Sequence, residues 1–231
     1  MGWRWIAPFV FATQILCAVD PYLYCEKRWG ELEWQGMTFR RYSLRAEGFP
    51  REKLYQLLVK NFDGSHTETF FYRANNRGHL ILEPIKEIED GAYAICPVKR
   101  GERLTFIMRS EDKEEHIIAD VVPFPIETKS KKGVKVHLEL MGNLGEEFLL
   151  TAEGFLPGEE IQVSCYYNDS IIGLHPAIDE KGKLRAVITL PEDSEGTATL
   201  IVHRNAEEIV LSFDWGAPAL KLVGACCLEV K

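Results

Sequence analysis

The sequence lacks the short motifs that mark the common catalytic and cofactor sites. It contains no Gly-x-Ser-x-Gly nucleophile elbow, no phosphate-binding glycine loop and no Cys-x-x-Cys pair beside a histidine cluster. Its six histidines are too far apart in the sequence for a helical metal pair. We therefore predict no cofactor, no metal site and a protein that is not an enzyme.

Positive charge is also scarce. The chain has 27 Lys and Arg against 35 Asp and Glu, a formal net charge of −8. The one basic cluster, Lys129–Lys135, lies where a linker between domains is expected. An acidic chain without a basic stripe is a poor partner for nucleic acid or for anionic membrane surfaces.

Long hydrophobic runs are confined to the N-terminus. Arg4 precedes the mostly apolar stretch Ile6–Ala18, and Leu16-Cys17-Ala18 is an acceptable small-residue cleavage site. This pattern predicts a signal peptide over residues 1–18, with an uncleaved interfacial anchor as the alternative. The longest later apolar stretch, Ala217–Val223, is broken by proline and lysine. We predict an exported protein with no transmembrane span in the mature chain.

One segment of the sequence occurs twice. Ser43-Leu-Arg-Ala-Glu-Gly-Phe49 returns as Leu149-Leu-Thr-Ala-Glu-Gly-Phe155. The residues after each copy are also similar, since Gly101-Glu-Arg-Leu104 matches Gly196-Thr-Ala-Thr-Leu200. The chain therefore reads as two related domains in tandem.

The second copy shows the period of β-strands. Val134, Val136, Leu138 and Leu140 alternate with polar residues, as in a half-buried strand. The segment continues with about seven short strands separated by turn signals every 8–12 residues or so, which is typical of an immunoglobulin-like sandwich.

The segment Pro50–Phe62 is ambiguous. Leu54, Leu57, Leu58 and Phe62 fall at helical spacing, but the matching segment of the second copy, 160–166, alternates as a strand. The repeat favours a strand, because tertiary context commonly overrides local propensity.

These observations predict an all-β chain of two tandem immunoglobulin-like β-sandwich domains after a signal peptide. The expected divisions are a signal peptide (1–18), an N-terminal extension (19–37), a first domain (38–126), a linker (127–133), a second domain (134–216) and a C-terminal tail (217–231).

The second domain resembles the bacterial immunoglobulin-like domains of exported proteins. The residues that carry the resemblance are Ala152-Glu-Gly-Phe-Leu-Pro-Gly-Glu-Glu-Ile161, Asp179-Glu-Lys-Gly-Lys-Leu184, Leu190-Pro191 and Gly196-Thr-Ala-Thr-Leu200. The first domain departs from the pattern, because Pro50-Arg-Glu52 lacks the glycine of the turn. The resemblance implies modules that space, bind or assemble.

The cysteines suggest bonds to other chains. Removal of Cys17 would leave five, and an odd count in an exported protein indicates a thiol or an intermolecular bond. Cys96 and Cys165 are interpreted as buried, reduced hydrophobic residues. Cys25, Cys226 and Cys227 lie outside the predicted sandwiches, and if the domains extend end to end, they lie at opposite ends. We hypothesise that these three link the protein into a disulfide-bonded oligomer.

The favoured function is a non-catalytic exported protein that uses its sandwiches for binding, spacing or assembly, in the periplasm or on the outer surface of a bacterial envelope. The expected partner is an envelope protein, with Trp29 and Trp34 as candidate contacts. One alternative is a periplasmic chaperone that donates a strand to surface subunits. A less favoured alternative is an enzyme with Cys25 as its thiol nucleophile.

Overall fold

The structure, a computed structural model, describes residues 22–34, 36–50, 53–74, 80–82, 93–114, 116–205 and 207–230. The predicted signal peptide lies outside the described residues. Within the part that is described, no helix is both long and apolar enough to cross a bilayer.

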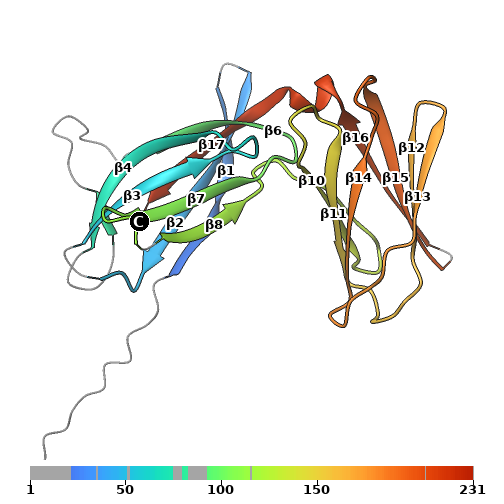
Figure 1. Cartoon of the computed structure of the whole chain (residues 1–231), viewed down its shortest axis with the longest axis horizontal. Helices are drawn as coiled ribbons and strands as arrows, with labels where there is room; N and C mark the ends of the chain where they lie inside the picture. Colours follow the sequence, from blue (N-terminus) through green and yellow to red (C-terminus); the bar gives the residue numbers. More distant parts are fainter. Residues whose placement is uncertain are drawn as a thin grey trace, which may run out of the picture.

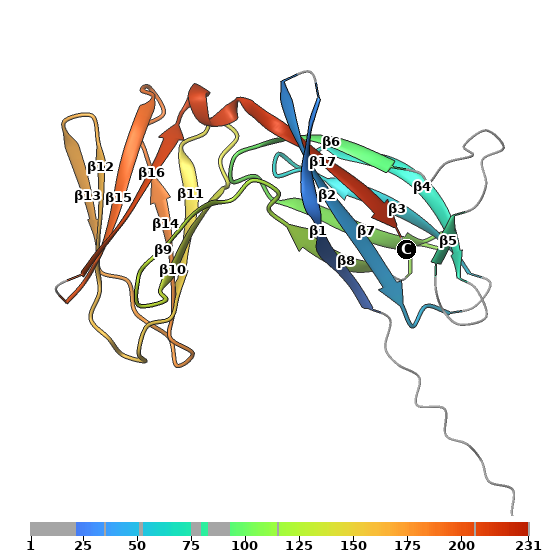
Figure 2. The same cartoon turned by 180° about the vertical axis from the view of Figure 1, so that it is seen from behind.

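The described chain is all-β and forms two sandwiches (Figures 1 and 2). Domain 1 consists of β1 (Tyr22–Trp34), β2 (Met37–Glu47), β3 (Leu54–Lys60), β4 (His66–Ala74), β5 (Leu80–Leu82), β6 (Tyr93–Lys99), β7 (Leu104–Ser110), β8 (His116–Val121) and β17 (Leu222–Val230). Domain 2 consists of β9 (Ile126–Lys129), β10 (Lys135–Leu140), β11 (Glu147–Glu153), β12 (Gln162–Tyr167), β13 (Ser170–Leu174), β14 (Lys183–Thr189), β15 (Gly196–Arg204) and β16 (Glu207–Trp215). A 3₁₀ turn, η1 (Ala217–Leu220), joins β16 to β17.

Each sandwich packs two sheets around its own core. Domain 1 pairs a sheet of order β1-β2-β17-β6 with one of order β5-β4-β3-β7-β8. Domain 2 pairs β14-β11-β10-β9 with β13-β12-β15-β16. Two separate clusters of buried apolar side chains fill the spaces between the sheets.

The repeated Ala-Glu-Gly-Phe marks the same structural event in both domains. β2 and β11 each end at the glutamate of the motif. The next residue is Gly48 in one copy and Gly154 in the other, with φ of 78° and 97°, a conformation that favours glycine. The phenylalanines that follow, Phe49 and Phe155, are both buried. The motif thus ends a strand and anchors the turn in the core.

The ambiguous segment is a strand, as the repeat predicted. β3 pairs with β4 on one side and β7 on the other. Tyr55, Leu57 and Val59 alternate into the core and are almost completely buried. Burial at every second residue is the pattern of a β-strand. The leucines fall at helical spacing in the sequence because Leu58, between Leu57 and Val59, is also buried.

The C-terminal segment is not a tail outside the sandwiches, and that prediction is wrong. Leu222–Val230 forms β17, which runs back from domain 2 into domain 1 (Figures 1 and 2). There it lies between β2, to which it is parallel, and β6, to which it is antiparallel.

Comparison with domain 2 shows how β17 changes the sheet of domain 1. In domain 2, β11 and β14, which correspond to β2 and β6 by chain order, pair directly and antiparallel. In domain 1 the two strands keep their opposite directions but are separated by β17. A strand placed between two antiparallel neighbours must be parallel to one of them, which explains the single parallel pairing.

Two other predicted divisions also change. The N-terminal extension supplies β1, which pairs with β2 along most of its length. The segment predicted as a linker, 127–133, belongs to domain 2, because β9 pairs with β10. Domain 2 is therefore inserted into domain 1, between β8 and β17.

We predict that Gly224→Ala destabilises the protein. A Cβ at Gly224 would lie 2.3 Å from the Thr38 carbonyl oxygen and 2.4 Å from Cζ of Phe124. Such overpacking costs about 1–3 kcal/mol. Urea unfolding measures the loss. Gly173→Ala in β13 is the matched control, since nothing lies within 4 Å of its Cβ position. Equal stability of the two variants would contradict the close packing of β17.

Candidate functional site

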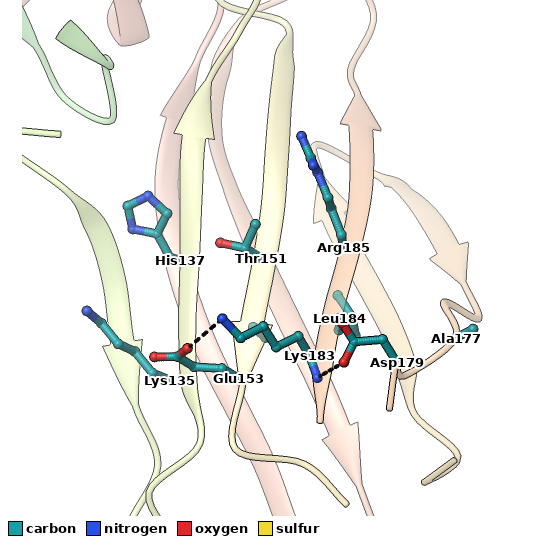
Figure 3. Close-up of a pocket in the computed structure, with 10 residues that line it drawn as sticks. Lys135, His137, Thr151, Glu153, Ala177, Asp179, Lys183, Leu184 and Arg185 are labelled. Carbon is teal, nitrogen blue, oxygen red and sulfur yellow. Dashed lines mark hydrogen bonds and ion pairs between the residues drawn. The ribbon is translucent and has the colours of Figure 1, made fainter. Parts of the chain in front are cut away.

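The outer face of the β14-β11-β10-β9 sheet carries two rows of polar side chains, and six of these side chains line a hollow of about 610 Å³ (Figure 3). Strand register sets the rows, because directly opposed residues of neighbouring strands project from the same face. The first row is Lys129, Lys135, Glu153 and Lys183, and the second is Glu127, His137, Thr151 and Arg185.

The two rows are more basic than the chain as a whole. Lys129, Lys135, Lys183 and Arg185 outnumber Glu127 and Glu153, in a protein of net charge −8. Glu153 Oε2 lies 3.7 Å from Lys183 Nζ, and Glu127 Oε2 lies 2.9 Å from Lys135 Nζ. Asp179 also lines the hollow and adds a third carboxylate, so the basic side chains still outnumber the acidic ones by one. Among the residues that the structure describes, no cluster of three potential metal ligands occurs.

His137 connects this face to the domain junction. It lines the hollow of the two rows. It also lines a second hollow, which is bounded by Arg40 and Tyr42 of domain 1 and by Pro123 of the segment between β8 and β9. Burial lowers the pKa of His137, and Lys135 and Arg103 lower it further. Glu139 and Glu127 act in the opposite direction without reversing the shift.

The junction between the domains is polar, hydrogen-bonded and partly buried. The backbone N–H of Leu140 donates to the Gly101 carbonyl at 3.0 Å, and that of Gly101 donates to Phe124 at 2.7 Å. The Glu102 carboxylate, only 2% exposed, accepts the backbone N–H of Lys99 at 2.7 Å. Burial raises the pKa of Glu102, although this hydrogen bond opposes the shift.

Two side-chain contacts also cross the junction. Arg103 of domain 1 donates to Glu139 of domain 2 with an N–O distance of 2.6 Å, and this bond raises the pKa of Arg103. Phe62, from the β3–β4 turn, packs against the core of domain 2. The Nζ atom of Lys99 lies 4.4 Å from the centre of the Phe62 ring.

The predicted contact and cysteine residues all lie in the β1-β2-β17-β6 sheet. Cys25, Trp29 and Trp34 belong to β1, while Cys226 and Cys227 belong to β17. The side chains of Cys25, Trp29, Trp34 and Cys227 lie outside what the structure describes. Whether the tryptophans contact a partner stays a prediction.

The premise that Cys25 and Cys226 lie at opposite ends of the molecule is wrong. Cys25 is opposite Leu44 of β2 and Cys226 is opposite Arg40, so they flank the same strand. Four residues of β2 separate the two positions, roughly 13 Å along the strand. A disulfide requires Cα atoms within about 7 Å, so the register does not allow a bond between them.

The structure instead brings Cys226 beside Cys96, a pair that sequence reasoning missed. The two are directly opposed in the pairing of β17 with β6. No local signal links residues so distant in sequence, because only the return of β17 to domain 1 brings them together. Cys165 is buried in domain 2, as predicted, and burial raises the pKa of its thiol to about 11.

Comparison with known proteins identifies no family. No family model matches the chain, and no curated protein matches it. Among solved structures it is similar to one described as the tetra-tandem repeat in the extending region of a large adhesion protein, with 8% sequence identity and a TM-score of 0.32. The match covers 85% of this chain and 50% of that one. A likeness at this level carries no argument about function.

We predict that His137 makes the protein less stable as the pH falls. Because its pKa is lower in the folded protein than the ordinary value of 6.5, the unfolded chain binds more protons once the pH falls to about that value. Stability from this group is therefore present above pH ~6.5 and is lost below it. Urea unfolding at pH 7.5 and 5.5 measures the change.

His137→Gln should lose less stability over this pH interval than the wild type. His175→Gln, at an exposed position, is the control for histidine removal in general. Identical pH dependence of the wild type and His137→Gln would contradict the assignment.

Proposed function

We propose that this chain is a non-catalytic exported protein whose two sandwiches form one stiff module for binding, spacing or assembly at a bacterial envelope. The observation that carries the proposal is the double crossing between the domains. One crossing is the segment between β8 and β9, and the other is η1 followed by β17. Two covalent connections restrict hinge motion far more than the single linker usual between tandem domains.

The junction contacts support a stiff module. The Arg103–Glu139 ion pair, the packing of Phe62 against domain 2 and the Leu140–Gly101 hydrogen bond all resist bending. A stiff module holds its binding surfaces at a fixed separation, which is the property that a spacer or an assembly unit requires. The basic rows beside the junction offer a surface to the acidic groups of a protein partner.

Export is the other part of the proposal, and the N-terminal sequence supports it. The apolar stretch Ile6–Ala18 behind Arg4 has the composition of a secretory signal. The periplasm and the outer surface are both consistent with such a signal, and the partner would be found in the envelope.

The strand-donating chaperone stays a prediction with less support. A donor strand needs a row of exposed apolar residues at alternate positions. In β8, the alternate exposed residues are His116, Ile118 and Asp120, of which one is apolar. An enzyme that uses Cys25 also stays a prediction, since the side chain of Cys25 lies outside what the structure describes.

We predict that cells which produce the full-length chain export it and remove residues 1–18. Mass spectrometry of the protein recovered by osmotic shock or from the envelope should show a chain that begins at Val19. A variant with Leu16→Arg, which places a charge in the apolar stretch, should remain in the cytoplasm. Full-length wild-type protein in the cytoplasmic fraction would contradict the proposal.

We predict that Arg103→Met loosens the two domains. The substitution removes the partner of Glu139, whose side chain is 12% exposed, and should cost about 1 kcal/mol. Small-angle X-ray scattering should show a wider distribution of interdomain distances. Lys183→Met is the control, because it breaks an exposed 3.7 Å ion pair between two residues of domain 2. Equal scattering from both variants would argue against a stiff junction.

A further inference from the structure

Two cysteines that are distant in sequence face each other across neighbouring strands of domain 1. Cys226 of β17 is directly opposite Cys96 of β6 in an antiparallel pairing. Residues opposed in this way have Cα atoms about 4.5–5.5 Å apart and side chains on the same face of the sheet. This separation falls within the range of about 4.4–6.8 Å that a disulfide spans.

Both side chains also point into the same core. Cys226 is completely buried within the apolar cluster of domain 1, and the half-buried Cys96 packs against that cluster. Val98, two residues from Cys96 on the same face of β6, is also completely buried. The core therefore holds both sulfur atoms on one side of the sheet.

The strand register makes this pair specific. The next residue, Cys227, is paired with Ile95 and not with Cys96. Cys25 is separated from Cys226 by β2, and Cys165 lies in the core of domain 2. Of the cysteines at described strand positions, only Cys96 is placed to react with Cys226.

We propose that Cys96 and Cys226 are an oxidation site, and that an intramolecular disulfide between them locks the C-terminal strand into domain 1. The two thiols give up two protons and two electrons to a disulfide donor, such as oxidised glutathione. One S–S bond forms between Sγ atoms of the protein, while the S–S bond of the donor breaks and yields two thiols.

The reaction follows exchange through a mixed disulfide. Cys96 is the more accessible of the two cysteines, so it attacks the donor first, and Cys226 then displaces the donor thiol. The geometric argument is independent of where the protein resides. That the bond forms in cells rests on the proposed export, because disulfides persist in oxidising compartments.

The bond would join β17, which follows domain 2 in the chain, to β6, which precedes it. The closed loop would run from Cys96 to Cys226 and would contain all of domain 2. Closure of so long a loop removes much conformational freedom from any state in which β17 has left its place. Oxidation would thus convert a hydrogen-bonded terminal strand into a permanent part of domain 1.

The experiment uses the purified full chain in defined glutathione buffers, so that it does not depend on export. Oxidation should yield a monomer in which peptide mapping recovers Cys96 joined to Cys226. Amide hydrogen exchange in β17 should slow by roughly 100-fold or more on oxidation, because strand release is blocked.

Single substitutions distinguish this pair from the alternatives. Cys96→Ser and Cys226→Ser should abolish the linked peptide and the slower exchange in β17. Cys227→Ser and Cys165→Ser, the matched controls, should keep both. Cys96→Ser leaves Cys226 in the core, so it tests the bond even where Cys226→Ser folds poorly.

Several results would overturn the proposal. These are a wild-type linkage through Cys227 or Cys25, a Cys96–Cys226 linkage between two chains, and a failure to oxidise in buffers that oxidise ordinary protein dithiols. Cytoplasmic retention of the protein, with the bond formed in vitro, would contradict the proposed export and leave this site intact.

Discussion

Domain 1 depends on the backbone pairing of its last strand. β17 supplies hydrogen-bonding partners to β2 on one side and β6 on the other, so its removal would expose two strand edges in the middle of a sheet. Cys226 fills the core beneath this strand, and Gly224 allows its backbone to approach Thr38 and Phe124. The first sandwich therefore requires residues from both ends of the described chain, and the second interrupts it.

This topology explains the polar junction between the domains. The chain crosses twice, so residues on both sides are held close enough to form defined contacts. Buried Glu102 accepts a backbone hydrogen bond, and Arg103 reaches Glu139 across the boundary. His137 belongs to the second of the two rows and also lines the hollow beside Arg40 and Tyr42 of domain 1. The surface proposed for a partner is thus built next to the stiffest part of the module.

The two domains differ in how local their contacts are. In domain 2, the strands from β9 to β16 are consecutive in sequence, and the core closes without help from elsewhere. Domain 1 pairs its second strand with its last, across the whole of domain 2. Contacts of such sequence separation close long loops and therefore form slowly. The final step in the formation of domain 1 is therefore expected to be insertion of β17, which also brings Cys226 beside Cys96.

Local sequence was sufficient to predict the all-β class, the two related sandwiches and the strand Leu54–Lys60. Alternation of apolar residues reports which face of a strand is buried, and the repeated Ala-Glu-Gly-Phe identifies equivalent turns. The basic rows, the junction and the cysteine pair were not predictable in this way. Each depends on which strands become neighbours, and Leu222–Val230 carries no signal that selects domain 1. Only the three-dimensional pairing of β17 decides that choice, because the strand binds where two edges are open to it.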